Sequence, residues 1–156
     1  MDESKSQKDI FRDSWIRYMG YSNEVGEAFR PVVPVRLVRA SYGVAFTYVL
    51  ADTVDKGVRM MMEDGRPRNV MRATGDALIW QTLASIVIPG ITINRICAIS
   101  GSVLTKYNRI PPRLRGLLTV GVGLASIPII ITPIDTAVTL LMDRTYRKWV
   151  EQPKEA

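Results

Sequence analysis

Residues 116–134 read GLLTVGVGLASIPIIITPI and contain no charged side chain. A second uncharged run, ALIWQTLASIVIPGITIN, occupies residues 77–94. At about 1.5 Å of rise per helical residue, each run covers roughly 27–29 Å, close to the ~30 Å hydrocarbon core of a bilayer. The two runs therefore predict two helices that cross a membrane.

A third apolar segment extends from Val35 to Ala51, and its only charged residues, Arg36 and Arg39, lie near its start. It can cross a bilayer if both arginines extend their guanidinium groups toward the lipid headgroups. The sequence thus predicts an all-α membrane protein with about three transmembrane helices. The predicted spans are 35–51, 77–94 and 116–134, within one helical membrane domain over residues 1–156.

Glycine and proline set the expected ends and bends of these spans. Gly57 is expected to follow the end of the first helix, and residues 58–76 are expected to form a charged linker. Pro89 predicts a kink in the second span, because proline has no backbone N–H to donate. Gly121 and Ala125 predict a face of small residues at which another helix approaches the third span closely.

An amphipathic segment precedes the first span, in the N-terminal region 1–34. Phe11, Trp15 and Tyr18 recur there at helical spacing, which predicts a short amphipathic helix over residues 8–20. Its aromatic face can pack on the protein's own spans or lie in the membrane interface, where Trp and Tyr are favoured. The pattern is compatible with both.

A second amphipathic segment follows the third span. Thr132 and Pro133 are typical of a helix start, with Asp135 in the first turn. This pattern favours a C-terminal amphipathic helix that restarts at Pro133 and runs to about Trp149. In the alternative, the third span continues to Met142 and places Asp135 inside the bundle, where an acid is a candidate functional group.

The basic excess of the chain is concentrated in one loop. The chain has 21 Lys and Arg residues against 15 Asp and Glu residues, and residues 95–115 contain no acid at all. The basic residues of this loop are Arg95, Lys106, Arg109, Arg113 and Arg115. A basic loop between two apolar runs is typical of a membrane-flanking segment and argues against nucleic acid as the partner. The last four are therefore candidates for binding anionic lipid.

Residue types that carry catalysis are scarce. The chain has no histidine, the commonest general base and metal ligand, and no nucleotide-binding or nucleophile-elbow motif. Its single cysteine, Cys97, lies in an apolar context and is expected to be a small packed residue. The sequence therefore argues against an enzyme and predicts no cofactor and no metal site.

Four blocks carry a resemblance to a known family. They are DIFRDSWIRYMGYSNEVGEAFR (9–30), SYGVAFTYVLADTVDKG (41–57), WQTLASIVIPGITINR (80–95) and LASIPIIITPID (124–135). Together they resemble the mitochondrial fission process protein family, also called mitochondrial 18 kDa protein. The resemblance implies a multi-pass protein of the inner mitochondrial membrane that promotes mitochondrial fission, without assigned catalytic residues.

The resemblance implies a role but no mechanism. One hypothesis is a scaffold or adaptor that packs with other inner-membrane proteins. The alternatives are a regulator of inner-membrane permeability or of a carrier, and a structural subunit of an inner-membrane complex. A conducting path needs polar groups within the spans, and only Gln81, the hydroxyl residues and Asp135 qualify. This scarcity favours the scaffold.

The first block also supplies candidate docking residues. Trp15, Tyr18 and Tyr21 alternate with charges in a way that insertion into the membrane does not explain. In an inner membrane the basic loop is expected on the matrix side, where cardiolipin is the candidate anionic lipid for it to bind. Three spans then place the N-terminus in the matrix, and both the 52–76 linker and the C-terminal tail in the intermembrane space.

Overall fold

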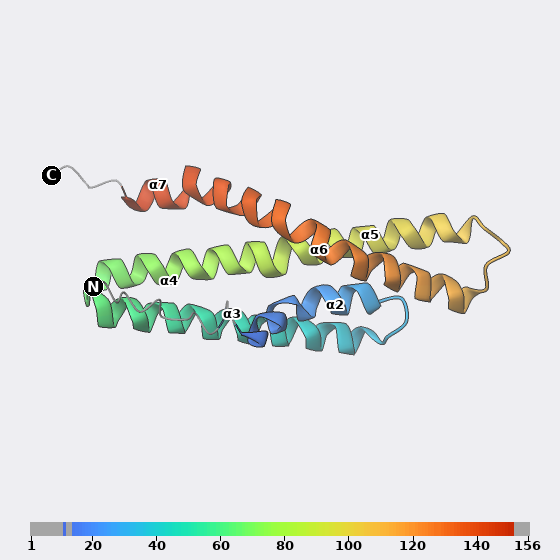
Figure 1. Ribbon diagram of the computed structural model, residues 1–156, viewed down its shortest axis with the longest axis horizontal. Helices are drawn as coiled ribbons and strands as arrows, with labels where there is room; N and C mark the ends of the chain where they lie inside the picture. The colour runs from blue at the N-terminus through green and yellow to red at the C-terminus, as the bar shows by residue number, and fades with distance from the viewer. Residues whose placement is uncertain (1–10, 12–13, 152–156) are drawn as a thin grey trace, which may run out of the picture.

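The computed structural model describes Phe11 and residues 14–151, and no β-strand occurs among these residues. A 3₁₀ helix comes first, and a π-helical turn joins two of the longer helices (Figure 1). The elements are η1 (Trp15–Tyr21), α2 (Ser22–Phe29), α3 (Val35–Glu63), α4 (Pro67–Gln81), η2 (Thr82–Val87), α5 (Ile88–Thr105), α6 (Pro112–Arg144) and α7 (Tyr146–Glu151). The predicted all-α class is confirmed.

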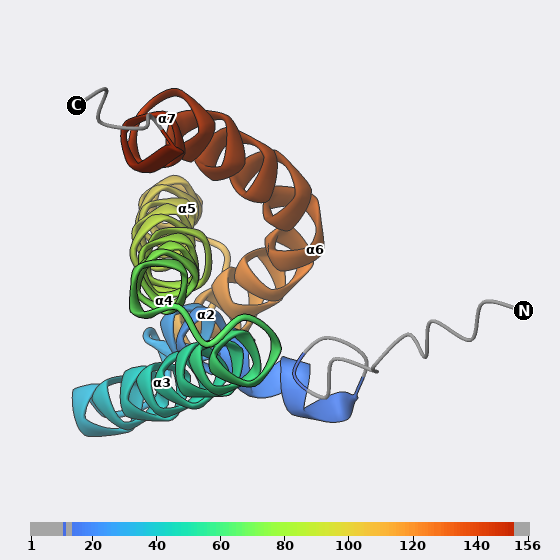
Figure 2. The ribbon, with the colours of Figure 1, turned by 90° about the vertical axis from the view of Figure 1, so that its left-hand side faces the viewer.

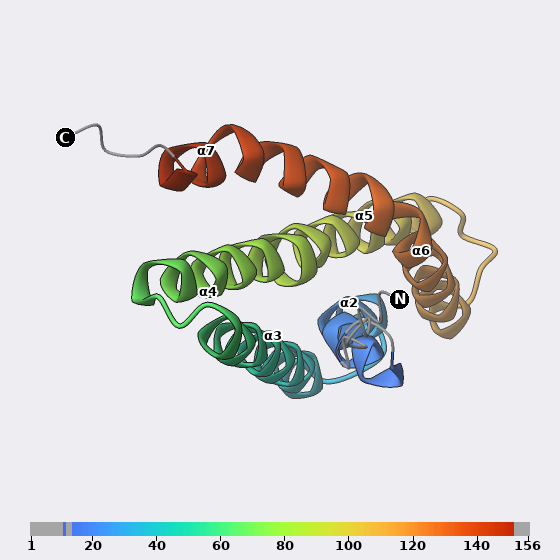
Figure 3. The same ribbon diagram turned by 60° about the vertical axis from the view of Figure 1, so that its left-hand side comes forward.

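Three long rods make up the architecture. Helix α3 runs antiparallel to the continuous rod formed by α4, η2 and α5, and α6 returns along α5 before it diverges (Figure 1). Viewed down the long axis, α6 arcs from the side of α2 to the far side of the middle rod, where α7 ends the described chain (Figure 2). The short helix α2 lies in the angle between α3, α5 and the start of α6 (Figure 3).

The buried apolar side chains form three small clusters along the bundle rather than one large core. The first joins α3 to η2 (Ala45, Tyr48, Val49, Ile86). The second joins α2 to α5 (Ala28, Ile93, Cys97), and the third joins η2 to α6 (Ala84, Val138, Met142). Many large apolar side chains of α3, α5 and α6 remain exposed, which is the pattern of helices that face lipid.

Two helical stretches are long and apolar enough to cross a membrane, Pro67–Thr105 and Pro112–Glu151. They contain the predicted spans 77–94 and 116–134. Helix α3, which contains the predicted span 35–51, does not meet the same criterion of length and composition. The third span therefore stays a prediction.

The expected boundaries around the first span are wrong. Helix α3 continues past Gly57 to Glu63, and helices rather than a linker occupy most of 58–76. Gly57 marks a close helix contact instead, because a Cβ there would lie 2.7 Å from Oγ1 of Thr74. The turn falls at Gly65, whose φ of 66° suits a residue without a side chain.

The expected restart at Pro133 is also wrong. Helix α6 is continuous through Pro128 and Pro133 and ends at Arg144. Asp135 therefore lies in the interior of a helix and caps nothing, in agreement with the alternative in which the third span continues past it. Neighbouring helices can compensate for the backbone bond that each proline removes, as they do in other membrane helices.

The irregularity predicted at Pro89 is observed as the π-helical turn η2, which ends just before it. There the backbone N–H of Ile88 bonds to the carbonyl of Leu83, five residues earlier. The side-chain amide of Asn23, from α2, donates to the backbone carbonyl of Ile86 over 3.2 Å. A polar residue of a distant helix thus supplies a donor to the distorted turn.

Among the glycines of α6, Gly123 lies closest to the neighbouring helices, two residues from the predicted position. A Cβ at Gly123 would lie 2.8 Å from Sγ of Cys97 and 2.9 Å from Cβ of Ala28. A Cβ at Gly121 would meet nothing within 4 Å, and Ala125 is exposed. The small-residue face predicted at Gly121 and Ala125 therefore makes no close contact within the described chain.

We expect Gly123→Ala to lower the free energy of unfolding by about 1–3 kcal/mol, because the added methyl overpacks the junction of α2, α5 and α6. Gly121→Ala is the matched control in the same helix, and we expect it to be neutral or stabilising by up to about 1 kcal/mol. Denaturant unfolding in detergent micelles measures both. Equal effects of the two substitutions would contradict this junction.

Candidate functional site

Two of the candidate docking residues point away from the bundle. Trp15 is 76% exposed and Tyr18 is 72% exposed. Phe11, from the same predicted face, packs inward instead, with its ring edge-on to Tyr48 at 5.8 Å between centroids. The alternative in which the aromatic face packs on the protein's own spans therefore holds for Phe11 and is wrong for Trp15 and Tyr18.

Hydrogen bonds within η1 hold its backbone and one of its aromatic side chains in place. The hydroxyl of Ser14 accepts from the backbone N–H of Ile16 over 3.3 Å and caps the 3₁₀ helix. The guanidinium of Arg17 donates to the hydroxyl of Tyr21 over 3.1 Å and lies 6.0 Å from the centre of its ring. Tyr21 is thus half-buried and held by an intramolecular contact, so the freely exposed aromatic pair is Trp15 and Tyr18.

The predicted basic loop is shorter than expected, because α5 extends to Thr105 and α6 begins at Pro112. Lys106, Arg109 and Arg113 are exposed. Arg115 is half-buried, and its Nε donates to the carbonyl of Ile110 over 2.8 Å. Arg115 therefore closes the loop, whereas the other three side chains are available at the surface.

The fold adds a second basic segment to the same end of the molecule. The turn between α2 and α3 lies at the end that also holds the α5–α6 loop (Figure 1), and a Cβ at Gly116 would touch Val32 at 3.0 Å. The basic residues of these two segments are Arg30, Arg36, Arg39, Lys106, Arg109, Arg113 and Arg115. No acid occurs within residues 30–39 or 95–115. We call this surface the basic end.

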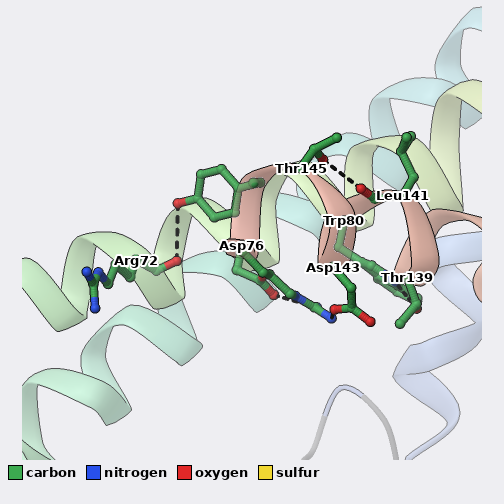
Figure 4. A network of polar contacts seen from close by, with 9 residues as sticks. Arg72, Asp76, Trp80, Thr139, Leu141, Asp143 and Thr145 are labelled. Carbon is green, nitrogen blue, oxygen red and sulfur yellow. Dashed lines mark hydrogen bonds and ion pairs between the residues drawn. The ribbon is translucent and has the colours of Figure 1, made fainter. Parts of the chain in front are cut away.

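The opposite end carries mixed charge and a large cavity. A cavity of about 790 Å³ lies between α3, α4, α6 and α7, and both acidic and basic side chains line it. Beside it, the guanidinium of Arg147 bonds to both carboxylate oxygens of Asp76, at 2.6 and 2.9 Å, and to Asp143 at 2.8 Å (Figure 4). The indole of Trp80 donates to the hydroxyl of Thr139 over 3.0 Å. These contacts fasten the end of α6 and α7 to α4.

Buried polar groups line the interior between the two ends. Glu27 of α2 accepts bonds from Arg30 (2.7 and 2.8 Å), from the hydroxyl of Tyr42 (2.9 Å) and from the amide of Asn94 (3.0 Å). Burial alone would raise the pKa of Glu27, but the bonds from Arg30, Asn94 and Tyr42 outweigh it and hold that pKa below its ordinary value. Glu27 is therefore a fully paired carboxylate.

A second buried acid lies further along the interior. Asp52 of α3 accepts from the ammonium of Lys56 and from the side-chain amide of Gln81, each at 2.7 Å. The hydroxyl of Ser85 then donates to the oxygen of the Gln81 amide, also at 2.7 Å. This chain of bonds crosses from α3 to η2.

Glu24 differs from both of these acids. It is 1% exposed, and neither of its carboxylate oxygens has a hydrogen-bond partner among the described residues. Burial, and secondarily the negative charge of Asp135 on α6, raise the pKa of Glu24 to about 8. Within the same described part of the chain, no group of three or more His, Cys, Asp or Glu residues is placed to hold a metal ion.

The burial of these acids was not predicted. Gln81, the hydroxyl residues and Asp135 were the polar groups identified within the predicted spans, whereas Glu24, Glu27 and Asp52 lie outside those spans. The signal was available in α2, where Asn23, Glu24 and Glu27 recur at helical spacing on one side. Polar residues on the buried side of a helix are typical where the opposite side faces lipid.

Comparison with known proteins gives consistent matches over nearly the whole chain. The sequence model of the mitochondrial 18 kDa protein family (MTP18) matches residues 6–74 and 66–142. Mitochondrial fission process protein 1 of Danio rerio is 50% identical over 151 residues, which cover 94% of this chain and 92% of the relative. The Homo sapiens protein of that name is 50% identical over 147 residues, covering 92% of this chain and 89% of the relative.

A more distant animal protein matches over the same length. Mitochondrial fission process protein 1 of Caenorhabditis elegans is 45% identical over 152 residues, with 94% of this chain and 92% of the relative covered. No solved structure matches the chain. The family match and the relatives of about half identity, each covered almost end to end, show that this chain belongs to the mitochondrial 18 kDa protein family.

Proposed function

We propose that this protein is a multi-pass protein of the inner mitochondrial membrane that promotes mitochondrial fission as a scaffold or adaptor. The relatives' name, mitochondrial fission process protein 1, supports the role in fission. The two long apolar helical stretches support integration into the membrane. The observation that carries the adaptor mechanism is the exposed pair Trp15 and Tyr18 beside a tightly packed bundle.

Trp15 and Tyr18 suit a docking role because they expose apolar surface that no other part of the described chain covers. Two large aromatic side chains at over 70% exposure leave apolar surface that a partner protein can cover. They belong to η1, which is capped by Ser14 and joined directly to α2, so their backbone is ordered before a partner arrives. A preordered aromatic platform is typical of a binding surface.

The basic end is the second interaction surface of this proposal, and its partner is anionic lipid such as cardiolipin. Residues 30–39 and 95–115 contain basic residues and no acid, although Arg30 is paired with Glu27, and this excess of basic residues favours the matrix side by the positive-inside rule. The α3–α4 turn and the C-terminal helix α7 then face the intermembrane space. Other inner-membrane proteins are the proposed partners of Trp15 and Tyr18. Nucleic acid is not a proposed partner.

A second candidate function is regulation of inner-membrane permeability, directly or through a carrier. The observation in its favour is the series of polar groups through the bundle, with Glu27, Asp52 and Gln81 buried and Asn94 half-buried. Such groups line ion and proton paths in membrane proteins. Against conduction, Glu27 and Asp52 are each held by an ion pair and by further hydrogen bonds.

The docking role is tested by Trp15→Ala combined with Tyr18→Ala. We expect overexpression of the unchanged protein to fragment the mitochondrial network. We expect the double variant to reach normal abundance and to lose this effect, because exposed side chains serve a partner and not the fold. Phe11→Ala is the control, since Phe11 packs on Tyr48, and we expect it to lower abundance. A double variant that is abundant and fully active would refute the docking proposal.

The lipid role is tested by replacing Lys106, Arg109 and Arg113 with Gln. At about 1 kcal/mol for each basic residue, we expect cardiolipin to bind the detergent-solubilised protein roughly 100-fold more weakly, with phosphatidylcholine as the reference lipid. The control replaces Arg66, Arg68 and Arg144, at the opposite end, and we expect binding to be retained. Equal losses in both variants would show that net charge, and not the basic end, governs lipid binding.

Ion flux separates the two candidate functions. We expect liposomes that contain the protein to hold a potassium gradient as long as empty liposomes, because the paired acids of the interior leave no continuous hydrated path. A faster loss of the gradient that disappears in Gln81→Leu would favour the permeability function over the scaffold.

A further inference from the structure

Glu24 is the one described acidic side chain whose burial is not matched by bonding partners. It lies on α2, which packs against η1, α3, α5 and α6, and it is 1% exposed. Both of its carboxylate oxygens lack a hydrogen-bond partner among the described residues. Glu27 and Asp52 are buried to a similar degree, and each of these accepts bonds from a cation and from an amide.

This contrast determines the charge that Glu24 can carry. An ionised carboxylate that is buried without a donor or cation is so costly that the group takes up a proton instead. The neighbours increase this cost. The titratable groups that face this region are Arg17 of η1, Glu27 of α2, Tyr42 of α3, Cys97 of α5 and Asp135 of α6.

None of these groups supplies the missing positive charge. Arg17 is bound to the hydroxyl of Tyr21, and its interaction with a carboxylate is with Asp135. Asp135 is itself an acid and repels an ionised Glu24. Tyr42 already donates its hydroxyl to Glu27. The uncharged, protonated carboxyl is thus the form of Glu24 that this packing accommodates.

We propose that Glu24 is a proton-binding site and that the packed position of α2 in the bundle requires the bound proton. Loss of the proton leaves a carboxylate that can be hydrated only if α2 separates from α3, α5 and α6. The ligand is H⁺, which binds one carboxylate oxygen and forms an O–H bond. No other reactant takes part.

The way in which α2 packs explains why the response involves the whole helix. A Cβ at Gly26 would overlap the side chain of Ser41, and a Cβ at Gly123 would lie 2.9 Å from Cβ of Ala28. Contacts this close hold α2 against α3 and α6, so water reaches the buried Glu24 carboxylate only when these contacts open. Because η1 is continuous with α2, the exposed aromatic pair Trp15 and Tyr18 moves when α2 moves.

The direction of the pH dependence follows from the raised pKa. The folded carboxyl titrates at about 8, whereas an exposed one titrates near 4.5. The stabilisation by the proton is therefore complete below the exposed value and is lost as the pH rises through about 8. Within this window the equilibrium constant for separation of α2 rises about tenfold per pH unit.

Hydrogen exchange on the full chain in lipid nanodiscs tests the proposal. We expect the protection factors of the α2 amides to fall about 100-fold between pH values of about 5.5 and 7.5, after correction for intrinsic exchange rates. In Glu24→Gln, which has the shape of the protonated acid and no charge, we expect protection to stay constant. Glu27→Gln is the matched control: it loses the bonds from Arg30 at every pH and keeps the pH dependence.

Infrared spectroscopy provides a second readout that does not depend on a variant folding well. We expect the carbonyl stretch of a protonated carboxylic acid at neutral pH in the unchanged protein, its loss at alkaline pH, and its absence in Glu24→Gln. Three outcomes would overturn the proposal: no such band, α2 protection that is independent of pH, or protection that follows added Na⁺, K⁺ or Ca²⁺. The last would identify a metal cation in place of the proton.

Discussion

The burial of a polar helix face is the constraint on which the rest of this structure depends. Helix α2 buries Asn23, Glu24 and Glu27 together with Ala28. Buried polar groups need partners inside the protein, and Glu27 and Asn23 find theirs on the neighbouring helices. The polar face of α2 therefore fixes how the surrounding helices are placed.

Several other features follow from the position of α2. Its amide side chain at Asn23 reaches the carbonyl of Ile86 in the π-helical turn before Pro89. Its Glu27 joins α3 and α5 through Tyr42 and Asn94. Its Ala28 lies against Gly123, which fixes the contact between α2 and α6. One short helix therefore connects the three long rods, which otherwise share few buried apolar residues.

The sequence predicts the helices well, but it predicts poorly where they end and how they pack against one another. Uncharged length and periodicity are local, so the all-α class and the two long apolar helices follow from them. Whether a helix crosses Gly57 or Pro133 depends on contacts with Thr74 and with neighbouring helices, which no local pattern contains. The burial of Glu24 and Asp52 was missed for the same reason, because it depends on how α2 and α3 pack against their neighbours.

The two candidate surfaces also depend on structure that no local sequence pattern contains. Trp15 and Tyr18 lie three residues apart in the 3₁₀ helix η1 and therefore share one exposed face, which an α-helical periodicity does not predict. The basic end grows from one loop to two segments only because α2 and α3 turn at the same end as α5 and α6. Both surfaces join α2 within the chain: η1 precedes it, and Arg30 follows it. A change in how α2 packs therefore reaches the aromatic pair and the basic end together, and no separate pathway between them is needed.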